Sequence, residues 1–350
     1  MNREHELAAG TSERRLAPRV WFVFLLKAFV TVGLISWLAM SGSLDMASLG
    51  VLLHSPKILA ATLGTWLVTA GLLSALRWRL LLTMVGVQLP LGRAVALQAM
   101  GHFFNGVVPG NVGGDVLKNI HVQRSLPREE RGHVVLVVLS ERLAGLAGLV
   151  WVAALSVIFG GMNLHEQARS LVGGLGVLAV GFALLPTVGP YLVTRLAPVE
   201  RATWPSWLRR ALALARSSLE VLQRGKRQLL GAFLLSMGMH GIGMLLFALL
   251  TRELGNADAE LSRVALVFPL GMLSLAVPIS LAGMGVGHVA FQKLFEMVSL
   301  VNGATIFNVY IVGQIAPSIV GVVPYLLMRP KKPEALEAAP EVVAGSTQAP

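Results

Sequence analysis

The sequence predicts an all-α, polytopic integral membrane protein, a bundle of about seven to eight transmembrane helices that includes re-entrant or broken helices. Hydrophobic residues make up 55% of the 350-residue chain and charged residues only 13%, about half the charged share of a soluble protein. Several apolar runs reach the roughly 20 residues that a helix needs to cross a bilayer core. Two shorter apolar runs adjoin Pro- and Gly-rich sequence, which favours half-helices or re-entrant segments.

Seven apolar runs are predicted to cross the membrane. The first of them, residues 20–40, is longer than the apolar core of a signal peptide, so we interpret it as a retained anchor. The two short pieces are residues 94–108 and 286–301. The seven predicted spans are residues 20–40, 58–76, 133–159, 171–193, 229–250, 264–281 and 305–327.

The distribution of Lys and Arg predicts the orientation. With both termini inside, the inside segments hold 22 of the 29 basic residues and the outside loops hold 4. Cytoplasmic loops of membrane proteins carry such an excess. We therefore expect a multi-pass protein of the cell's inner (plasma) membrane with both termini in the cytoplasm. For this topology to close, residues 94–108 must return to the inside, and residues 286–301 must cross or nearly cross.

The chain divides into a cytoplasmic N-terminal segment, a transmembrane domain and a cytoplasmic tail, which are residues 1–19, 20–328 and 329–350. The tail is rich in Pro, Ala and Glu, which predicts disorder. Within the cytoplasmic loop 194–228, apolar residues recur at helical spacing opposite a face rich in Arg. We interpret residues 207–223 as an amphipathic helix that binds anionic phospholipid of the inner leaflet, with a solvated connector helix as the alternative.

Composition and motifs narrow the functional classes. The formal net charge is +11, but the basic residues lie between apolar runs, which favours lipid headgroups over nucleic acid as the partner. The chain has no cysteine, so disulfides and thiolate metal sites are excluded. The sequence shows no metal-ligand spacing, no catalytic Ser/His/Asp order and no phosphate-binding loop. We therefore expect no catalytic residues, no metal, no cofactor and no ATP-driven step.

Two breaks in apolar sequence are the most informative features. In the first, Asn105 and Pro109 lead through several glycines to Asp115, and Pro109 cannot continue a helix. The second begins at Pro278 and ends at His288. Unwound backbone at membrane depth needs surrounding protein or a water-filled cavity, and broken helices in two halves point to a transporter's central site. Whether the two breaks belong to an inverted repeat stays open. The Pro and Gly residues of the two motifs are Pro109, Gly110, Gly113, Gly114, Pro278, Gly283, Gly285 and Gly287.

Two neighbouring charges lie inside the predicted span 133–159. Glu141 and Arg142 stand eight or nine residues into it, where charged side chains are costly and usually face the bundle interior. Because neighbours on a helix point in different directions, each needs its own partner. A structural ion pair between helices and a substrate-binding role both stay open. The candidate partners are Asp115, Arg77, Arg79 and His240.

The motifs together resemble one known family. Phe104–Asp115 reads Phe-Asn-x-x-x-Pro-Gly-x-x-Gly-Gly-Asp, Arg77-Trp-Arg79 precedes it, and Glu141-Arg-Leu143 follows it. With Pro278…Gly283-x-Gly285-Val286 near the end, this order is similar to that of the lysylphosphatidylglycerol synthase transmembrane-region family, also called flippase-like domain proteins. The resemblance covers residues 20–328. One departure is that the family often has Arg-Glu after the last Gly-Val, where this chain has Gly287 and His288.

The resemblance implies a lipid-handling function. In the full-length synthases a soluble domain aminoacylates phosphatidylglycerol, and the membrane part is thought to move the product between leaflets; this chain looks like the membrane part alone. We therefore expect flippase-like translocation of an anionic, aminoacylated or polyprenyl-linked lipid, either downhill or ion-coupled. Two alternatives stay open, an intramembrane lipid-modifying transferase and a scaffold partner of a lipid-synthesis enzyme. The residues expected to hold the headgroup are Asn105, Asp115, Glu141, Arg142, Arg77 and Arg79.

Overall fold

The computed structural model of this chain describes residues 47–107, 113–123, 131–159, 220–275 and 285–328. It also describes single positions between 25 and 40, at 126, between 174 and 181, and at 218. Several predictions fall largely or wholly outside these residues. They are the spans 20–40 and 171–193, the amphipathic helix 207–223, the tail 329–350, and the motif residues Pro109, Gly110, Pro278 and Gly283.

The described elements are all helical, which confirms the predicted all-α membrane bundle. Four of these helices are long and apolar enough to cross a membrane, and each coincides with a predicted span. The four are Pro56–Val85, His133–Ile158, Lys226–Glu253 and Gly303–Leu327. In chain order the elements are η1 (Ala47–Gly50), α2 (Val51–His54), α3 (Pro56–Trp66), η2 (Leu67–Leu73), α4 (Ser74–Leu82), η3 (Thr83–Val85), α5 (Leu91–Val107), α6 (Gly113–Gln123), α7 (His133–Phe159), α10 (Lys226–Glu253), α11 (Leu261–Ser274), α12 (Val286–Met297), α13 (Gly303–Ile315), η5 (Ala316–Gly321) and α14 (Val322–Leu327).

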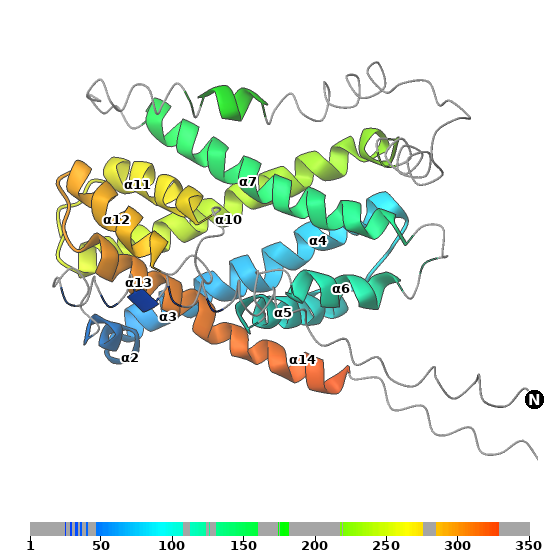
Figure 1. Cartoon of the computed structure of the whole chain (residues 1–350), viewed down its shortest axis with the longest axis horizontal. Coiled ribbons are helices and arrows are strands. Elements are labelled where there is room, and N and C mark those ends of the chain that lie inside the picture. The colour runs from blue at the N-terminus through cyan, green and yellow to red at the C-terminus, as the bar shows by residue number, and fades with distance from the viewer. Residues whose placement is uncertain are drawn as a thin grey trace, which may run out of the picture.

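The described helices follow the same order twice. A long helix is followed by two short helices with a break between them, and then by a second long helix. The short pair is α5 and α6 in the first set and α11 and α12 in the second. The two short pairs lie toward opposite ends of the long axis of the molecule (Figure 1). A helix order that occurs twice, with the short pairs at opposite ends, is a feature of proteins built from inverted repeats.

Two predicted boundaries need correction. The first long helix does not end before Arg77 but runs on to Val85, because Arg77 donates to a buried carboxylate and does not have to reach the membrane surface. In the second half, α11 ends at Ser274, and α12 has only 12 residues. At 1.5 Å per residue α12 is about 18 Å long, against a hydrocarbon core of about 30 Å, so α12 does not cross the membrane by itself.

Glycines allow the short helices to pack backbone against backbone. A Cβ atom on Gly114 would lie 1.8 Å from the carbonyl oxygen of Gly101, so α5 and α6 touch at these two residues. A Cβ atom on Gly303 would lie 2.4 Å from the carbonyl oxygen of Phe291, where α12 meets α13. Close packing through small residues is the usual way that helices associate in lipid, where the hydrophobic effect does not drive them together.

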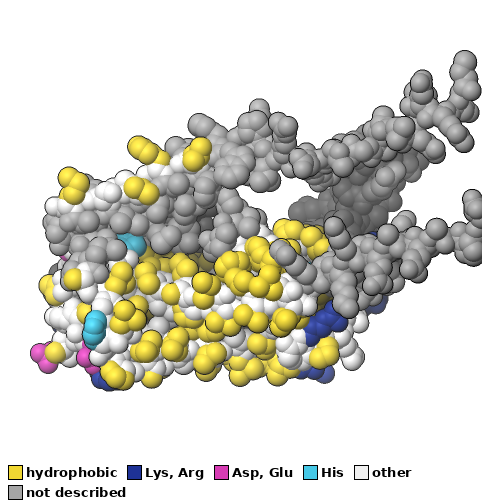
Figure 2. All heavy atoms as spheres, turned by 90° about the horizontal axis from the view of Figure 1, so that it is seen from below, with side chains coloured by type: hydrophobic (Ala, Val, Ile, Leu, Met, Phe, Trp, Pro, Cys, Tyr) yellow, Lys and Arg dark blue, Asp and Glu magenta, His cyan; other side chains and the backbone are white. Residues whose placement is uncertain are grey.

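Two large apolar clusters stabilise the bundle. One surrounds Phe247 of α10, whose ring contacts aromatic rings of α11, α12 and α13. The other surrounds the fully buried Trp78 of α4 and includes residues of α5, α6 and α7. Outside these clusters, hydrophobic side chains also cover the outer face that Figure 2 shows, and charged side chains lie toward its two ends, with most of the Lys and Arg at one of them. This distribution is expected of a surface that faces lipid and ends at charged headgroups.

Candidate functional site

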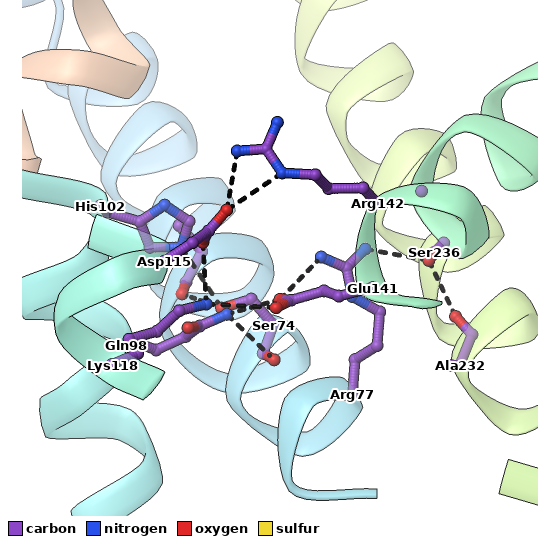
Figure 3. A network of polar contacts seen from close by, with 12 residues as sticks. Ser74, Arg77, Gln98, His102, Asp115, Lys118, Glu141, Arg142, Ala232 and Ser236 are labelled. Carbon is purple, nitrogen blue, oxygen red and sulfur yellow. Dashed lines mark hydrogen bonds and ion pairs between the residues drawn. The ribbon is translucent and has the colours of Figure 1, made fainter. Parts of the chain in front are cut away.

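A network of charged and polar side chains joins five helices inside the bundle (Figure 3). On α4, α5 and α6 the two members are three or four residues apart, so both lie on the same face of their helix. Adjacent residues on α7 point to different parts of the network, as the sequence predicts. The members are Ser74 and Arg77 on α4, Gln98 and His102 on α5, Asp115 and Lys118 on α6, Glu141 and Arg142 on α7, and Ser236 on α10.

Glu141 is the most connected carboxylate of the network. Its Oε1 accepts hydrogen bonds from Gln98 Nε2 at 2.9 Å and from Arg77 Nη2 at 3.2 Å. Its Oε2 accepts from Lys118 Nζ at 3.1 Å. Arg77 in turn donates through Nη1 to the hydroxyl of Ser236 at 2.9 Å. Because a buried charge without partners is strongly destabilising, donors from three helices are what allow a carboxylate at this place.

Asp115 forms the second centre of the network. Arg142 donates to Oδ2 of Asp115 through Nε at 3.1 Å and through Nη2 at 2.7 Å. Lys118 Nζ lies 3.3 Å from Oδ1 of Asp115, so this lysine pairs with both carboxylates. The Lys118 ammonium also lies 5.2 Å from the centre of the Trp78 ring, a cation–π contact that stabilises it further.

Gly101, Gly114 and Asn105 allow α5 and α6 to pack closely beside Lys118. A Cβ atom on Gly101 would lie 3.0 Å from Cδ of Lys118, so glycine leaves room for the aliphatic part of the lysine. Asn105 Oδ1 accepts the backbone N–H of Gly114 at 2.8 Å. That bond satisfies one of the free N–H groups in the first turn of α6. Asn105 therefore supports α6 through this bond, which the sequence did not reveal.

At the second break, His288 forms hydrogen bonds with the backbone before α12 and with α13. Gly285, just before α12, has a φ of 85°, a conformation that favours glycine. His288 is fully buried, and its Nδ1 accepts the N–H of Gly285 at 3.1 Å. Its Nε2 lies 3.1 Å from Oδ1 of Asn308 on α13, so the ring is neutral and carries its proton on Nε2. Where the family often has an acidic residue, this chain thus has a neutral hydrogen-bonded pair.

The structure brings most of the predicted charged residues together. Arg77 pairs with Glu141 and Asp115 pairs with Arg142, as two of the candidate pairings propose. Arg79 is exposed on α4 and points away from this interior. His240 Nε2 lies 3.0 Å from the carbonyl oxygen of Gly145, not beside Glu141 or Arg142 as a partner.

Lys118 and Gln98 are network residues that the sequence reasoning missed. By sequence Lys118 belongs to an inside loop, yet only 4% of its side chain is exposed. Its position three residues after Asp115, on a helix beginning at the glycines, is the signal that could have found it. Gln98 stands alone as a polar side chain in an apolar run, and such residues in membrane segments are often functional.

The cations of the network differ in their exposure. Among its described members, Arg77, Lys118 and Arg142 are cationic, and Asp115 and Glu141 are anionic. The side chain of Arg142 is 46% exposed, far more than those of the other two cations. Several buried polar atoms here also lack a hydrogen-bond partner, and such atoms favour a site that takes up water or a polar group. They are Arg77 Nε, Trp78 Nε1, Gln98 Oε1 and Asn119 Oδ1.

Metal binding finds no support in the part of the chain that the structure describes, where no three His, Asp or Glu side chains gather. The arrangement can instead bind a polar headgroup through its cations and hydrogen-bonding groups.

Comparison with family models gives a match over most of the chain. The family model described as Lysylphosphatidylglycerol synthase TM region matches residues 24–324, which include both breaks and every member of the network. No match was found among curated proteins or among solved structures.

Proposed function

The chain belongs to the lysylphosphatidylglycerol synthase transmembrane-region family, and from this premise we propose that it moves a lipid with a charged headgroup between leaflets. The family and the membrane-crossing helices make its function a membrane lipid-related one. The single observation that supports the finer proposal is the ion network inside the bundle, in which the side chain of Arg142 is 46% exposed. We place this activity in the cell's inner membrane.

The depth of Arg142 supports the proposal. Arg142 is the tenth residue of the 27-residue helix α7. It therefore lies about 14 Å along the helix from His133, within reach of the middle of a hydrocarbon core about 30 Å thick. A charged side chain near the centre costs about 2.5–3.5 kcal/mol on insertion scales and usually faces the bundle interior or a water-filled cavity. An exposed arginine at this depth is best explained by a polar path that reaches it.

A purely structural role explains the network less well. Buried ion pairs can often be replaced by apolar side chains without loss of stability, so helix packing alone does not need five charges. The exposure of the Arg142 side chain fits a site that an anionic group of a ligand can reach.

The two hairpins supply elements that can expose the site to each side in turn. In transporters built from inverted repeats, broken helices meet near the bilayer midplane, and alternating access comes from the movement of one repeat against the other. Here α5 and α6 carry four network members, while α11 and α12 form the opposite hairpin. The headgroup would pass through the polar interior while its acyl chains stay in the lipid.

Leaflet-specific labelling tests this proposal. The full chain is reconstituted into sealed vesicles that contain a trace of fluorescent phosphatidylglycerol, and a membrane-impermeant reductant bleaches the outer leaflet. We expect bleaching to continue into the inner-leaflet pool with the wild-type protein and to stop after the outer pool in protein-free vesicles.

Matched variants connect this activity to the network. Arg77→Gln removes a cation paired with Glu141, so translocation should fall strongly. Arg93→Gln, an exposed position in the first turn of α5, should keep wild-type activity. If wild-type vesicles bleach no further than empty ones with phosphatidylglycerol, its aminoacylated form and a polyprenyl phosphate, the protein is not a translocator of these lipids.

A further inference from the structure

The two short pairs of helices use the same helix position to contact the long helix that follows them. Asp115 is the third residue of α6 and pairs with Arg142 of α7. His288 is the third residue of α12 and bonds to Asn308 of α13. The second set of helices thus has a neutral, titratable side chain where the first set has an ion pair. The proposed function gives that side chain no role.

Both ring nitrogens of His288 form hydrogen bonds in the described arrangement. Nδ1 accepts the N–H of Gly285 at 3.1 Å, which completes a capping box in which Glu or Gln is the usual acceptor. Nε2 carries the proton of the neutral ring and donates to Oδ1 of Asn308 at 3.1 Å. Because Nδ1 acts as an acceptor, the ring cannot bind a second proton without losing the bond to Gly285.

The packing around His288 stabilises the neutral ring only. The ring is fully buried and contacts the ring of Phe307, with the two centres 4.9 Å apart. A Cβ atom on Gly287 would lie 2.6 Å from Phe307 and 2.7 Å from Leu275, so the first turn of α12 has little space to shift. A charged imidazolium in this apolar place would be costly without an anion beside it.

Among the described residues, no charged side chain faces the imidazole ring. On α13 the neutral amide of Asn308 faces it, and Tyr310 packs against rings of α10 and α11 instead. Toward the other end of α12, Lys293 and Glu296 are exposed and pair with each other at 2.8 Å. Residues 276–284 contain no Asp, Glu, Lys, Arg or His.

The titratable groups of α10 and α11 also have other partners. His240 of α10 lies 3.0 Å from a carbonyl oxygen of α7, and Glu253 pairs with Lys57 of α3. Arg252 and Arg263 each donate to a backbone carbonyl oxygen, at 3.2 Å and 3.3 Å. None of these groups is therefore a partner for a charged ring at the start of α12.

We propose that His288 is a proton-binding site that controls the position of α12. The neutral ring holds α12 against α13, and the imidazolium favours an arrangement in which the bond to Gly285 is broken and water surrounds the ring. One proton from that water forms the Nδ1–H bond and returns to water when the ring packs again. This inference goes beyond the proposed function, because it concerns a proton and not the lipid.

The physical basis is a difference in proton affinity between the two arrangements. A ligand shifts an equilibrium between two arrangements only by its difference in affinity for them. Here the difference comes from Nδ1 of His288, which accepts a hydrogen bond in the described arrangement and donates one after protonation. A lower pH should therefore release the first turn of α12.

Hydrogen exchange tests the proton site without any movement of lipid. The full chain in neutral detergent is exchanged at about pH 7.5 and about pH 5, on the two sides of the range in which histidine usually titrates. Each rate is divided by the intrinsic exchange rate at that pH, so only the protection is compared. Protection of the Gly285 amide should fall at least about fivefold at the lower pH, because a buried hydrogen bond is lost. Equal protection at the two pH values would overturn the proposal.

His288→Gln separates the proton from the hydrogen bonds. The amide oxygen of glutamine can accept the N–H of Gly285 while its NH₂ group donates to Asn308, but the amide binds no proton in this range. Protection should therefore be the same at both pH values. His54→Gln, at an exposed position of α2, is the matched control and should keep the wild-type pH effect. A pH effect that persists in His288→Gln would assign the proton to another group and overturn the proposal.

A second variant supplies the missing anion and serves if the glutamine variant does not fold. Asn308→Asp places a carboxylate beside Nε2 of His288, and a nearby opposite charge favours the charged ring. The loss of protection at Gly285 should then occur at a higher pH than in the wild type. An unchanged pH dependence would contradict the proposal.

The proton site and the translocator function can fail separately. Loss of protection at low pH without any leaflet exchange in vesicles would remove the translocator function and leave the proton site standing. Leaflet exchange together with protection that does not depend on pH would keep the translocator function and overturn the proton site. Where both hold, the rate of leaflet exchange should change with pH in the wild type more than in His288→Gln.

Discussion

Removing the charge of Glu141 should destabilise the protein more than any other single change in the network. Glu141→Gln keeps the shape of the side chain but leaves Arg77 with its carboxylate partner gone and Lys118 with only Asp115. Breaking a buried ion pair from one side costs about 3–5 kcal/mol. Because Lys118 keeps one anion and Gln98 can still donate to the new amide oxygen, we expect a loss near the lower bound, about 3 kcal/mol.

Reversible unfolding measures this loss. The seven tryptophans of the chain report unfolding by fluorescence as sodium dodecyl sulfate is added to mixed micelles. The double variant Glu141→Gln with Arg77→Met is the matched control, because it also removes the cation that has lost its carboxylate partner. It should be more stable than Glu141→Gln alone. A Glu141→Gln variant within about 1 kcal/mol of wild type would refute the reasoning, since it would show that these contacts do not hold a buried charge.

Three further outcomes are expected. Gly114→Ala should destabilise the protein by about 1–3 kcal/mol or more, because its Cβ atom would lie 1.8 Å from the Gly101 carbonyl oxygen. Gly92→Ala is the control and should not change stability, because no atom lies within 4 Å of the added Cβ. Equal melting curves for the two variants would contradict the close contact. His288→Ala should speed hydrogen exchange of the Gly285 amide and lower the free energy of unfolding by about 1–3 kcal/mol, because it removes the acceptor of that N–H. An unchanged exchange rate would show that the hydrogen bond is not made. A periplasm-active reporter fused after Met328 should be inactive, because the distribution of basic residues predicts a cytoplasmic location for this end. Activity of the reporter would refute the predicted topology.

The long helices could be predicted from the sequence because an apolar run of sufficient length has few other ways to fold in a membrane. Their ends were harder to place. Arg77 looks like the end of a span, but it is matched by Glu141, which is 64 residues away in the chain, so the helix continues. The lengths of α11 and α12 depend on where the break begins, and Pro and Gly mark a break only approximately.

The candidate site could be predicted in part. Glu141 and Arg142 stand out because charges inside apolar runs are rare, and Asp115 stands out at the end of a glycine-rich break. Lys118 could not be assigned with the same ease, since its burial depends on how closely α6 packs against α5 at two glycines. The role of Asn105 in supporting α6 likewise depends on the hairpin, which brings it to Gly114.

The central claim is that a polar path reaches the ion network inside the bilayer, and cysteine accessibility tests it most directly. The chain has no cysteine, so single substitutions need no prior removal. Leu139, three residues before Arg142 on α7, is 53% exposed, and Leu67 in η2 is 60% exposed. A charged thiol reagent reacts with thiolate, which forms in water but not in lipid. In sealed vesicles Leu139→Cys should react with the reagent while Leu67→Cys does not; equal, negligible labelling of both would contradict the account.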